Sequence, residues 1–354
     1  MFFRRKDRGG GAVAEAEPAA ESRRSIESEL SGTGEELAAE IRNLSDENRR
    51  GRDAARERRL LDLRHLAGIR MLEDAGSSPD HPAPDFEALP AADGLPDIAP
   101  EQATPELLRA GILRDGSFLV RDMVPRERAL AFAQTIDRVY DARLALETDR
   151  PGEPGHYEEF VSDERFGAPL ARPWIKVGGG VLAVDSPAAM FQMLEMFEES
   201  GINRLARGYL REPVGISGQK TTLRKAEPDV PGAWHQDGAF MGDVRALNVW
   251  VSLSRCGDEA PGLDIVPKRL DYLVTAGTDG AMLSYQVSQE NAEESAGETP
   301  IVRPVFEPGD VLFFDDLCLH QTASDPAMPN PRYAIESWFF GGSAWPEGYA
   351  PIAV

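Results

Sequence analysis

The 354-residue sequence is short of cysteine and of basic residues, and each shortage excludes a class of protein. Its two cysteines, Cys256 and Cys318, are too few for a disulfide framework, which favours a reducing compartment. They also lack the CxxC spacing of a thiolate metal or redox site. With 38 basic against 60 acidic residues the formal net charge is -22, which argues against nucleic acid as a partner, because binding phosphates requires clustered cations.

Long apolar runs are missing as well. No run approaches the ~20 residues of a transmembrane helix, so we expect no membrane association. The basic residues that follow Met1 lead into glycine-rich and acidic sequence instead of an apolar segment, so we expect no signal peptide. The expected location is therefore the cytoplasm.

Composition divides the chain into four predicted parts. Residues 1–32 are rich in Gly, Ala, Glu, Arg and Ser and are expected to be disordered. Residues 33–75 are expected to form a helical arm, because leucine and isoleucine recur there at helical spacing. Residues 76–103 hold six prolines with almost no periodicity, which indicates a linker or a segment wrapped along a surface. Residues 104–354 are the expected main domain.

The arm is predicted to contain one or two amphipathic helices. Thr33 and Glu36 have the spacing of a capping box, which marks the start of the first helix. We expect these helices to pack on the main domain or on a second subunit, which would allow a homo-oligomer. A regulatory or partner-binding arm is the alternative.

The main domain changes from helical to two-residue periodicity near residue 214. Helices are expected over about 125–147 and 202–210, and a strand over 173–177. The later candidate strands are Ile216–Arg224, Ala246–Leu253, Leu263–Val266, Met282–Gln286, Ile301–Phe306, Asp310–Phe314, Leu317–His320 and Tyr333–Phe340. This order predicts a mainly β fold with flanking helices, whose core is a double-stranded β-helix of the jelly-roll or cupin-like type, plus a helical N-terminal extension.

Two of the five histidines, His235 and His320, lie in strand-rich sequence. His235 is followed by Asp237, and residues two apart on a strand point to the same face. Two imidazoles and one carboxylate form the facial triad that holds iron(II) and leaves three positions open. A bidentate 2-oxo acid and dioxygen would fill those positions. A His-x-Asp pair alone could equally be a polar turn.

Arg332 stands at the head of the apolar segment Tyr333–Phe340. If that segment pairs with Leu317–His320, Arg332 lies near His320 and points into the barrel. A guanidinium in that position needs an anion, and it can hold a carboxylate by two parallel hydrogen bonds, which suits the distal carboxylate of 2-oxoglutarate. The alternative is a salt bridge to a neighbouring carboxylate: Asp315, Asp316 or Glu336.

Together these residues resemble the phytanoyl-CoA dioxygenase family of iron(II)- and 2-oxoglutarate-dependent oxygenases. The resemblance covers about residues 105–345 and extends to the segments Asn248-Val-Trp250, Gly262-Leu-Asp-Ile-Val-Pro267 and Glu307-Pro-Gly-Asp310. It implies a dioxygenase that hydroxylates or otherwise oxidises an unactivated C–H bond of a small molecule and releases succinate and CO2. The implied cofactors are iron(II), 2-oxoglutarate and dioxygen, with the metal on the predicted triad.

The resemblance also implies contacts to 2-oxoglutarate. Beside Arg332, it points to Thr322, which lies two residues after the distal histidine, and to Trp250 on the strand after the His-x-Asp pair. A lysine on an early strand of the family corresponds to Lys176. Gln219, or its neighbour Lys220, could also face the site from the strand before the motif.

The substrate itself stays open, because Val-Pro-Lys-Arg269 departs from the Pro-Gly-Ser-His loop common in relatives. Retention of Asp237 favours hydroxylation, desaturation or ring formation over halogenation, since related halogenases replace this carboxylate. Two other functions remain as alternatives. One is a cupin-like metalloenzyme with non-oxygenase chemistry, and the other is a non-catalytic oligomeric binding protein organised by the arm.

Overall fold

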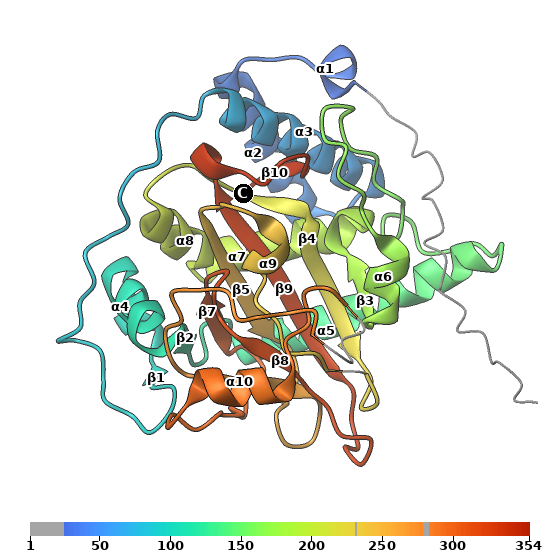
Figure 1. Cartoon of the computed structure of the whole chain (residues 1–354). Coiled ribbons are helices and arrows are strands. Elements are labelled where there is room, and N and C mark those ends of the chain that lie inside the picture. The colour runs from blue at the N-terminus through green and yellow to red at the C-terminus, as the bar shows by residue number, and fades with distance from the viewer. Residues whose placement is uncertain (1–24, 231, 279–282) are drawn as a thin grey trace, which may run out of the picture.

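A sheet of short strands lies at the centre of the chain, and helices cover one of its faces (Figure 1). The computed structural model describes residues 25–230, 232–278 and 283–354, so most of the segment 1–32, expected to be disordered, lies outside the described residues. Helices make up 37% and strands 19%, and the predicted mainly β composition is therefore wrong. No described helix is long and apolar enough to cross a membrane.

The helices come mostly from the first half of the chain and the strands mostly from the second. The helices are α1 (Ile26–Glu29), α2 (Gly34–Arg50), α3 (Ala54–Glu73), α4 (Pro105–Asp115), α5 (Arg126–Glu147), α6 (Arg172–Val177), α7 (Pro187–Glu199), α8 (Ile202–Leu210), α9 (Gly238–Met241) and α10 (Gln289–Ala296). The strands are β1 (Asp97–Ile98), β2 (Ser117–Val120), β3 (Gly180–Leu182), β4 (Val214–Ala226), β5 (Ala246–Ser252), β6 (Gly262–Ile265), β7 (Val311–Phe314), β8 (His320–Ala323), β9 (Arg332–Gly341) and β10 (Pro351–Ala353).

The described strands form two sheets. The larger has the order β1-β2-β7-β5-β9-β4-β10, with β3 also paired to β4, and the smaller consists of β6 and β8. All pairs are antiparallel except β1 with β2, so the larger sheet is mixed. The pairing of β4 with β9 shifts register between Ile216 and Thr221. Most of the predicted strands from residue 214 onward are therefore present, with boundaries that differ by a few residues.

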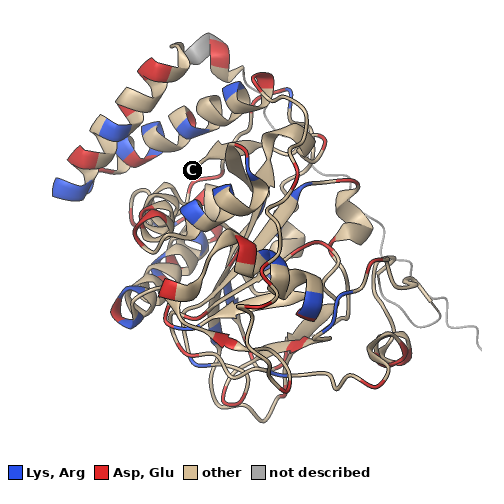
Figure 2. Cartoon of the chain, turned by 90° about the vertical axis from the view of Figure 1, so that its left-hand side faces the viewer, with Lys and Arg blue, Asp and Glu red and all other residues tan. Residues whose placement is uncertain are grey.

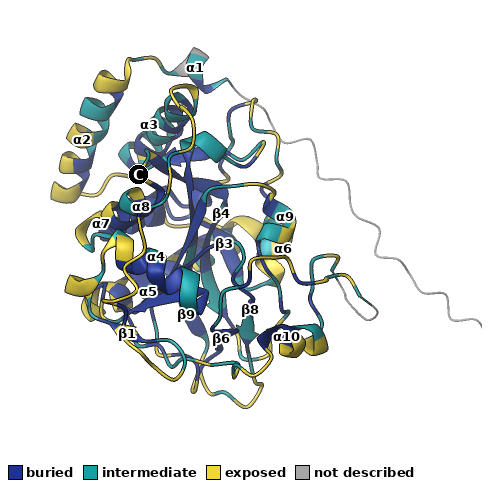
Figure 3. Ribbon diagram, turned by 60° about the vertical axis from the view of Figure 1, so that its left-hand side comes forward, coloured by how far each residue is buried: buried dark blue, intermediate teal, exposed yellow. Residues whose placement is uncertain are grey.

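The two faces of the larger sheet pack against different partners. On β5, Leu247, Val249 and Val251 join the core that also contains side chains of α5, α7 and α8. Trp250, which points to the opposite face, joins a second core that includes Ile265 of the smaller sheet. Alternation along a strand separates the two cores. Figure 3 shows the central strands as buried, with exposed residues mainly on outer sides of helices such as α2 and α10.

The arm helices α2 and α3 pack on the main domain of their own chain. The Thr33 hydroxyl accepts a hydrogen bond from the Glu36 amide at 3.3 Å, and the Glu36 carboxylate accepts one from the Thr33 amide at 2.8 Å, so the capping box is present. On α3 the buried His65 has Nδ1 2.8 Å from the Pro351 carbonyl oxygen of β10. Contact with a second subunit stays a prediction.

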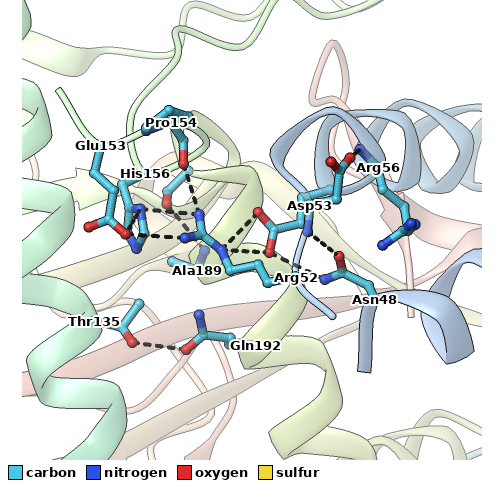
Figure 4. Close-up of polar contacts among 12 residues, drawn as sticks. Asn48, Arg52, Asp53, Arg56, Thr135, Glu153, Pro154, His156, Ala189 and Gln192 are labelled. Carbon is cyan, nitrogen blue, oxygen red and sulfur yellow. Dashed lines mark hydrogen bonds and ion pairs between the residues drawn. The ribbon is translucent and has the colours of Figure 1, made fainter. Parts of the chain in front are cut away.

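Charged contacts tie the start of α3 to the segment between α5 and α6. The Arg52 guanidinium donates to Glu57 at 2.9 Å, to the Pro154 carbonyl at 2.9 Å and to Nδ1 of the buried His156 at 3.2 Å (Figure 4). Burial lowers the pKa of His156, and the nearby Arg52 charge adds to this effect, so the neutral ring can accept that hydrogen bond. Acidic and basic residues alternate along the whole arm (Figure 2).

Four expected strands differ from the structure. One of them, Ile301–Phe306, forms only isolated bridges at Val302 and Phe306. Residues 173–177 lie in α6, because Pro173 fits the first turn of a helix. The Asp315 carboxylate accepts a hydrogen bond from the Leu317 amide and closes a turn, so β8 begins only at His320. Within 282–286, residue 282 lies outside the described residues and the others form no strand. The expected linker also differs, since it contributes β1 to the larger sheet.

The Glu-Pro-Gly-Asp turn before β7 connects several elements. The Asp310 carboxylate accepts hydrogen bonds from Arg121 at 2.5 Å, from the Asp122 amide at 3.0 Å and from the Glu307 amide at 2.9 Å. Gly309 has φ +106°, and a Cβ added to it would lie 2.1 Å from the Val124 carbonyl oxygen. Only glycine fits this position, because the backbone is left-handed and the neighbouring carbonyl leaves no space.

We expect Gly309→Ala to lower the free energy of unfolding by about 2 kcal/mol or more, through backbone strain and the clash with Val124. Urea denaturation followed by circular dichroism measures this. Gly167→Ala is the matched control, because an added Cβ there meets nothing within 4 Å. Equal stability of the two variants would contradict the assigned role of Gly309.

Candidate metal centre

Three predicted ligands, His235, Asp237 and His320, come together in the structure. His235 and His320 are partners in an isolated antiparallel bridge, with backbone N–H···O distances of 3.0 and 3.2 Å and ring centroids 4.5 Å apart. One ligand atom from each of the three residues lies within 4.8 Å of the others. The expected strand at the His-x-Asp pair is wrong, since the chain turns at Asp237 into α9. The turn, and not strand alternation, brings the carboxylate to the histidines.

The two imidazoles are oriented by backbone carbonyls. Nδ1 of His235 lies 2.8 Å from the Ala233 oxygen, and Nδ1 of His320 lies 3.1 Å from the Cys318 oxygen. Because a carbonyl oxygen can only accept, each Nδ1 carries the proton and each Nε2 keeps its lone pair for a metal. Burial lowers the pKa of His320 to about 4, and the adjacent His235 adds to this, so His320 is neutral at neutral pH. The Asp237 carboxylate is 4% exposed and has no hydrogen-bond partner in the described parts of the chain.

Gln236, between the two ligands, was not identified from the sequence as part of the site. Its amide nitrogen donates to the Tyr272 carbonyl at 3.0 Å and to the Leu317 carbonyl at 2.8 Å, and its amide oxygen accepts from the Val274 amide at 2.7 Å. The side chain is 1% exposed. It therefore fixes the His-x-Asp segment against the loop around residue 273 and the turn that leads to His320. No pattern in a single sequence marks this role.

Arg332 reaches the site by a route other than the expected one. It begins β9 and pairs with Ala226 of β4, while β8 pairs with β6, so the predicted hairpin between these segments is wrong. Its Nη1 donates to the Gly262 carbonyl of β6 at 2.9 Å, which bridges the two sheets. Burial lowers the pKa of this guanidinium to about 10. Among the described residues, none of the three alternative carboxylates forms an ion pair with it, and Glu336 pairs with Arg224 instead.

Buried polar atoms without hydrogen-bond partners gather on the inner face of the larger sheet. Among the described residues, Nε of Arg332, both amide atoms of Asn248 and Nε1 of Trp338 are in this state. Asn248 and Trp338 are register partners across β5 and β9, and alternation places Arg332 on the face of Trp338. Buried polar groups are nearly always hydrogen-bonded, so this cluster indicates a position for a polar ligand or water.

Two other expected co-substrate contacts lie on the same side. Thr322 is two residues after His320 on β8, so it shares the face of that ligand. Trp250 is 3% exposed, lies 5.7 Å from the Arg332 guanidinium carbon and packs on Phe306 at 4.7 Å between ring centroids. Their positions allow contact with a ligand held by Arg332, and the contact itself remains a prediction.

Lys176 and Gln219 have other roles in the structure. The Lys176 ammonium lies 2.7 Å from the Glu147 carboxylate at the surface, because residues 173–177 form a helix and not an inner strand. The Gln219 amide donates to the Ala168 carbonyl at 2.9 Å and accepts from the Ala350 amide at 2.9 Å. These contacts contradict the expectation that either side chain binds the co-substrate. The neighbour Lys220 points to the other face of β4.

A partly buried ion pair lies near the triad, and the sequence identified only its acidic member, Glu336, as a rival partner for Arg332. Arg224 of β4 donates to Glu336 of β9 at 2.9 and 3.2 Å, and the Thr222 hydroxyl also donates to Glu336. Burial alone would raise the pKa of Glu336, but Arg224, with smaller contributions from Lys220 and His320, holds it at about 2. The signal that could have found it is the presence of charged residues four positions apart on one face of β4 and of β9.

Comparisons with known proteins agree with this site. The family model described as Phytanoyl-CoA dioxygenase (PhyH) matches residues 112–325. No protein of curated function matches the sequence.

Solved structures with a similar fold share little sequence with this chain. EctD from S. alaskensis with 2-oxoglutarate and 5-hydroxyectoine is 18% identical over 76% of this chain and 85% of that one, with a TM-score of 0.46. The carbocyclase SnoK from nogalamycin biosynthesis is 16% identical over 70% and 87%, with a TM-score of 0.45. These low values carry no conclusion about a substrate. The family match spans more than half of the chain, and the chain therefore belongs to the phytanoyl-CoA dioxygenase (PhyH) family.

Proposed function

We propose that this protein is an iron(II)- and 2-oxoglutarate-dependent dioxygenase that oxidises an unactivated C–H bond of a small molecule. The observation that carries the proposal is the convergence of His235, Asp237 and His320 beside a buried arginine with an unsatisfied Nε. Membership of the PhyH family supports the same reaction class. Retained Asp237 favours hydroxylation, desaturation or ring formation over halogenation.

The residues present fit both iron(II) and 2-oxoglutarate. Two imidazoles and one buried carboxylate are a donor set suited to iron(II), and they leave positions open for further ligands. When bound here, iron(II) with 2-oxoglutarate and dioxygen supplies the oxidising chemistry, with succinate and CO2 as by-products. The Arg332 guanidinium would hold the distal carboxylate of 2-oxoglutarate, with Thr322 and Trp250 beside it. Asn248, which has unsatisfied donors and an acceptor, can bind oxygen atoms or water in the same interior.

The protein's own task is to orient the reactants and to exclude water. The carbonyls of Ala233 and Cys318 hold the imidazoles, and Gln236 holds the segment that carries Asp237. Apolar rings line the interior, including Phe314 4.8 Å from His320 between ring centroids. A water-poor interior strengthens the grip of Arg332 on an anion and protects reactive species from side reactions. No side-chain acid or base is required.

The proposal extends to the organisation of the chain. The two sheets would be the walls of a double-stranded β-helix, and residues 104–354 the oxygenase domain. Residues 33–75 would be an arm that supports this domain and could join a second copy. Both cysteines are free and buried, which supports a cytoplasmic location for the described domain.

The first test is an anaerobic titration of metal-free protein with iron(II) and 2-oxoglutarate. We expect the visible charge-transfer band of a chelated 2-oxo acid. The band should be lost in His235→Ala, which removes a ligand, and should need at least tenfold more 2-oxoglutarate in Arg332→Met, which removes the anion partner.

Arg126→Met is the control for Arg332→Met, because Arg126 is an exposed arginine that pairs with Glu307 at the surface. Its titration should match the wild type. If iron(II) binds and saturating 2-oxoglutarate gives no band, the co-substrate assignment is wrong and a cupin-like metalloenzyme of other chemistry takes its place. If the wild-type protein binds no metal, the remaining alternative is a non-catalytic oligomeric binding protein.

A second prediction concerns the ion pair beside the triad. The folded-state pKa of Glu336, about 2, lies below its ordinary value of 4.5, so its stabilisation is complete above pH 4.5 and disappears as the pH falls through about 2. Glu336→Gln leaves Arg224 without its counter-ion and should lower the free energy of unfolding at pH 7 by on the order of 1–3 kcal/mol.

Urea denaturation at pH 7 and pH 3 measures this effect, and the difference between wild type and Glu336→Gln should shrink at the lower pH. Glu147→Gln removes the exposed partner of Lys176 and is expected to change stability by less than about 0.5 kcal/mol. A Glu336→Gln protein as stable as the wild type at both pH values would contradict the role assigned to the pair.

A further inference from the structure

Lys220 is a lysine near the metal centre that has no counter-ion. Its ammonium forms no ion pair or hydrogen bond with any described residue and lies 3.9 Å from the centroid of the Phe240 ring. The three other lysines in the described chain each have a polar partner: Lys176 with Glu147, Lys225 with Asp137 and Lys268 with the Ser295 carbonyl. Burial lowers the pKa of Lys220, as expected for an ammonium that is partly removed from water.

Lys220 faces the metal centre from a different side than Arg332. Its neighbour Phe240 packs on Tyr285 at 5.1 Å between ring centroids, and Tyr285 packs on His235 at 6.2 Å. Arg332 instead contacts Trp250 and the Gly262 carbonyl. The carboxylates that act on Lys220 are Asp237 and Glu336, while Asp237 has no such effect on Arg332. The two cations therefore define separate positions.

The charges that face one another in the proposed complex balance, except at Lys220. Asp316 also lies near Asp237, but it is not among the carboxylates that act on Lys220. One positive charge on Arg332 and two on iron(II) are matched by the single charge of Asp237 and the two carboxylates of 2-oxoglutarate. Arg224 and Glu336 neutralise each other. Lys220 then remains as one uncompensated positive charge beside aromatic side chains. Lys220 is partly buried, and a charge removed from water is costly unless it is paired, so this position favours one negative charge from outside the chain.

We propose that Lys220 binds a carboxylate of the substrate that is oxidised, and that Phe240 and Tyr285 pack on the apolar part next to it. This inference rests on the proposed function and adds a substrate class to it: small carboxylic acids with an apolar body. A carboxylate supplies the single negative charge that the site lacks, whereas a phosphate monoester carries nearly two. The shift of register in β4 between Ile216 and Thr221 frees Lys220 from regular pairing with β9.

The test compares acids with their uncharged amides on anaerobic protein loaded with iron(II) and 2-oxoglutarate. The probes are 3-phenylpropanoate and hexanoate, each with its primary amide, and phenyl phosphate. Isothermal titration calorimetry gives the affinities, and consumption of 2-oxoglutarate in air gives a second readout. We expect wild-type protein to bind each acid at least tenfold more tightly than its amide, the factor of one charge-assisted hydrogen bond.

In Lys220→Met the ratio of acid to amide affinity should fall to about one, and Lys220→Arg should keep it. Lys225→Met is the matched control, since it removes a lysine from the other face of the same strand. The thermal midpoint of ligand-free Lys220→Met should be no lower than that of the wild type, because an unpaired charge is replaced by an apolar side chain of similar length. A purely structural lysine would give a lower midpoint.

Several outcomes would overturn the inference. They are equal affinity of wild type for acid and amide, binding of neither probe, or a preference for acids that persists in Lys220→Met. Phenyl phosphate binding more tightly than both acids would overturn the assignment to a carboxylate. If Lys220→Met needs more 2-oxoglutarate for the charge-transfer band, Lys220 belongs to the co-substrate position instead. A normal band with any of these results leaves the proposed function intact, while a missing band in wild type removes it.

Discussion

The cost of burying charge is the constraint on which the rest of this structure depends. The inner face of the larger sheet carries Arg224, Glu336, Arg332 and Lys220 in a region otherwise lined by aromatic and aliphatic side chains. Of these four residues, Arg224 and Glu336 neutralise each other. A fold that served packing alone would replace such groups by apolar residues at no loss of stability. We therefore infer that the other two cations, Arg332 and Lys220, pair with anionic ligands.

Each of the two sheets carries a different part of the proposed site. Helices pack on the outer face of the larger sheet. Its inner face carries Arg332, Asn248 and Trp250. The smaller sheet carries His320, and an isolated β-bridge to His320 positions His235. Arg332 joins the two walls through the Gly262 carbonyl, so the anion position and the metal position are set by one connected framework. A displacement of either wall would disturb both.

Much of the site could be predicted from the sequence, because its residue types are chemically distinctive. Two histidines, one aspartate and one arginine in apolar surroundings limit the chemistry strongly, and the structure brings the triad together. The predicted strand pairing was wrong. The expected hairpin paired the strand of Arg332 with the strand of His320, whereas β9 pairs with β4 and β5. Strand pairing depends on contacts between distant parts of the chain, so strands that follow each other in sequence need not pair in a sheet. The helix at 173–177 and the roles of Gln236 and Gln219 depend on loop contacts that no local pattern encodes.

Glu336 and Lys220 show where sequence reasoning could have gone further. Polar residues at alternate positions of β4 (Lys220, Thr222 and Arg224), on the face opposite to the apolar residues of the helical core, are unusual enough to count as a signal. Opposite charges on neighbouring strands can neutralise each other, and Arg224 with Glu336 does so. Once that pair is set aside, the lysine left over has no partner on any strand beside it. A surplus charge inside a barrel is then information about what enters it, and it is available before any substrate is known.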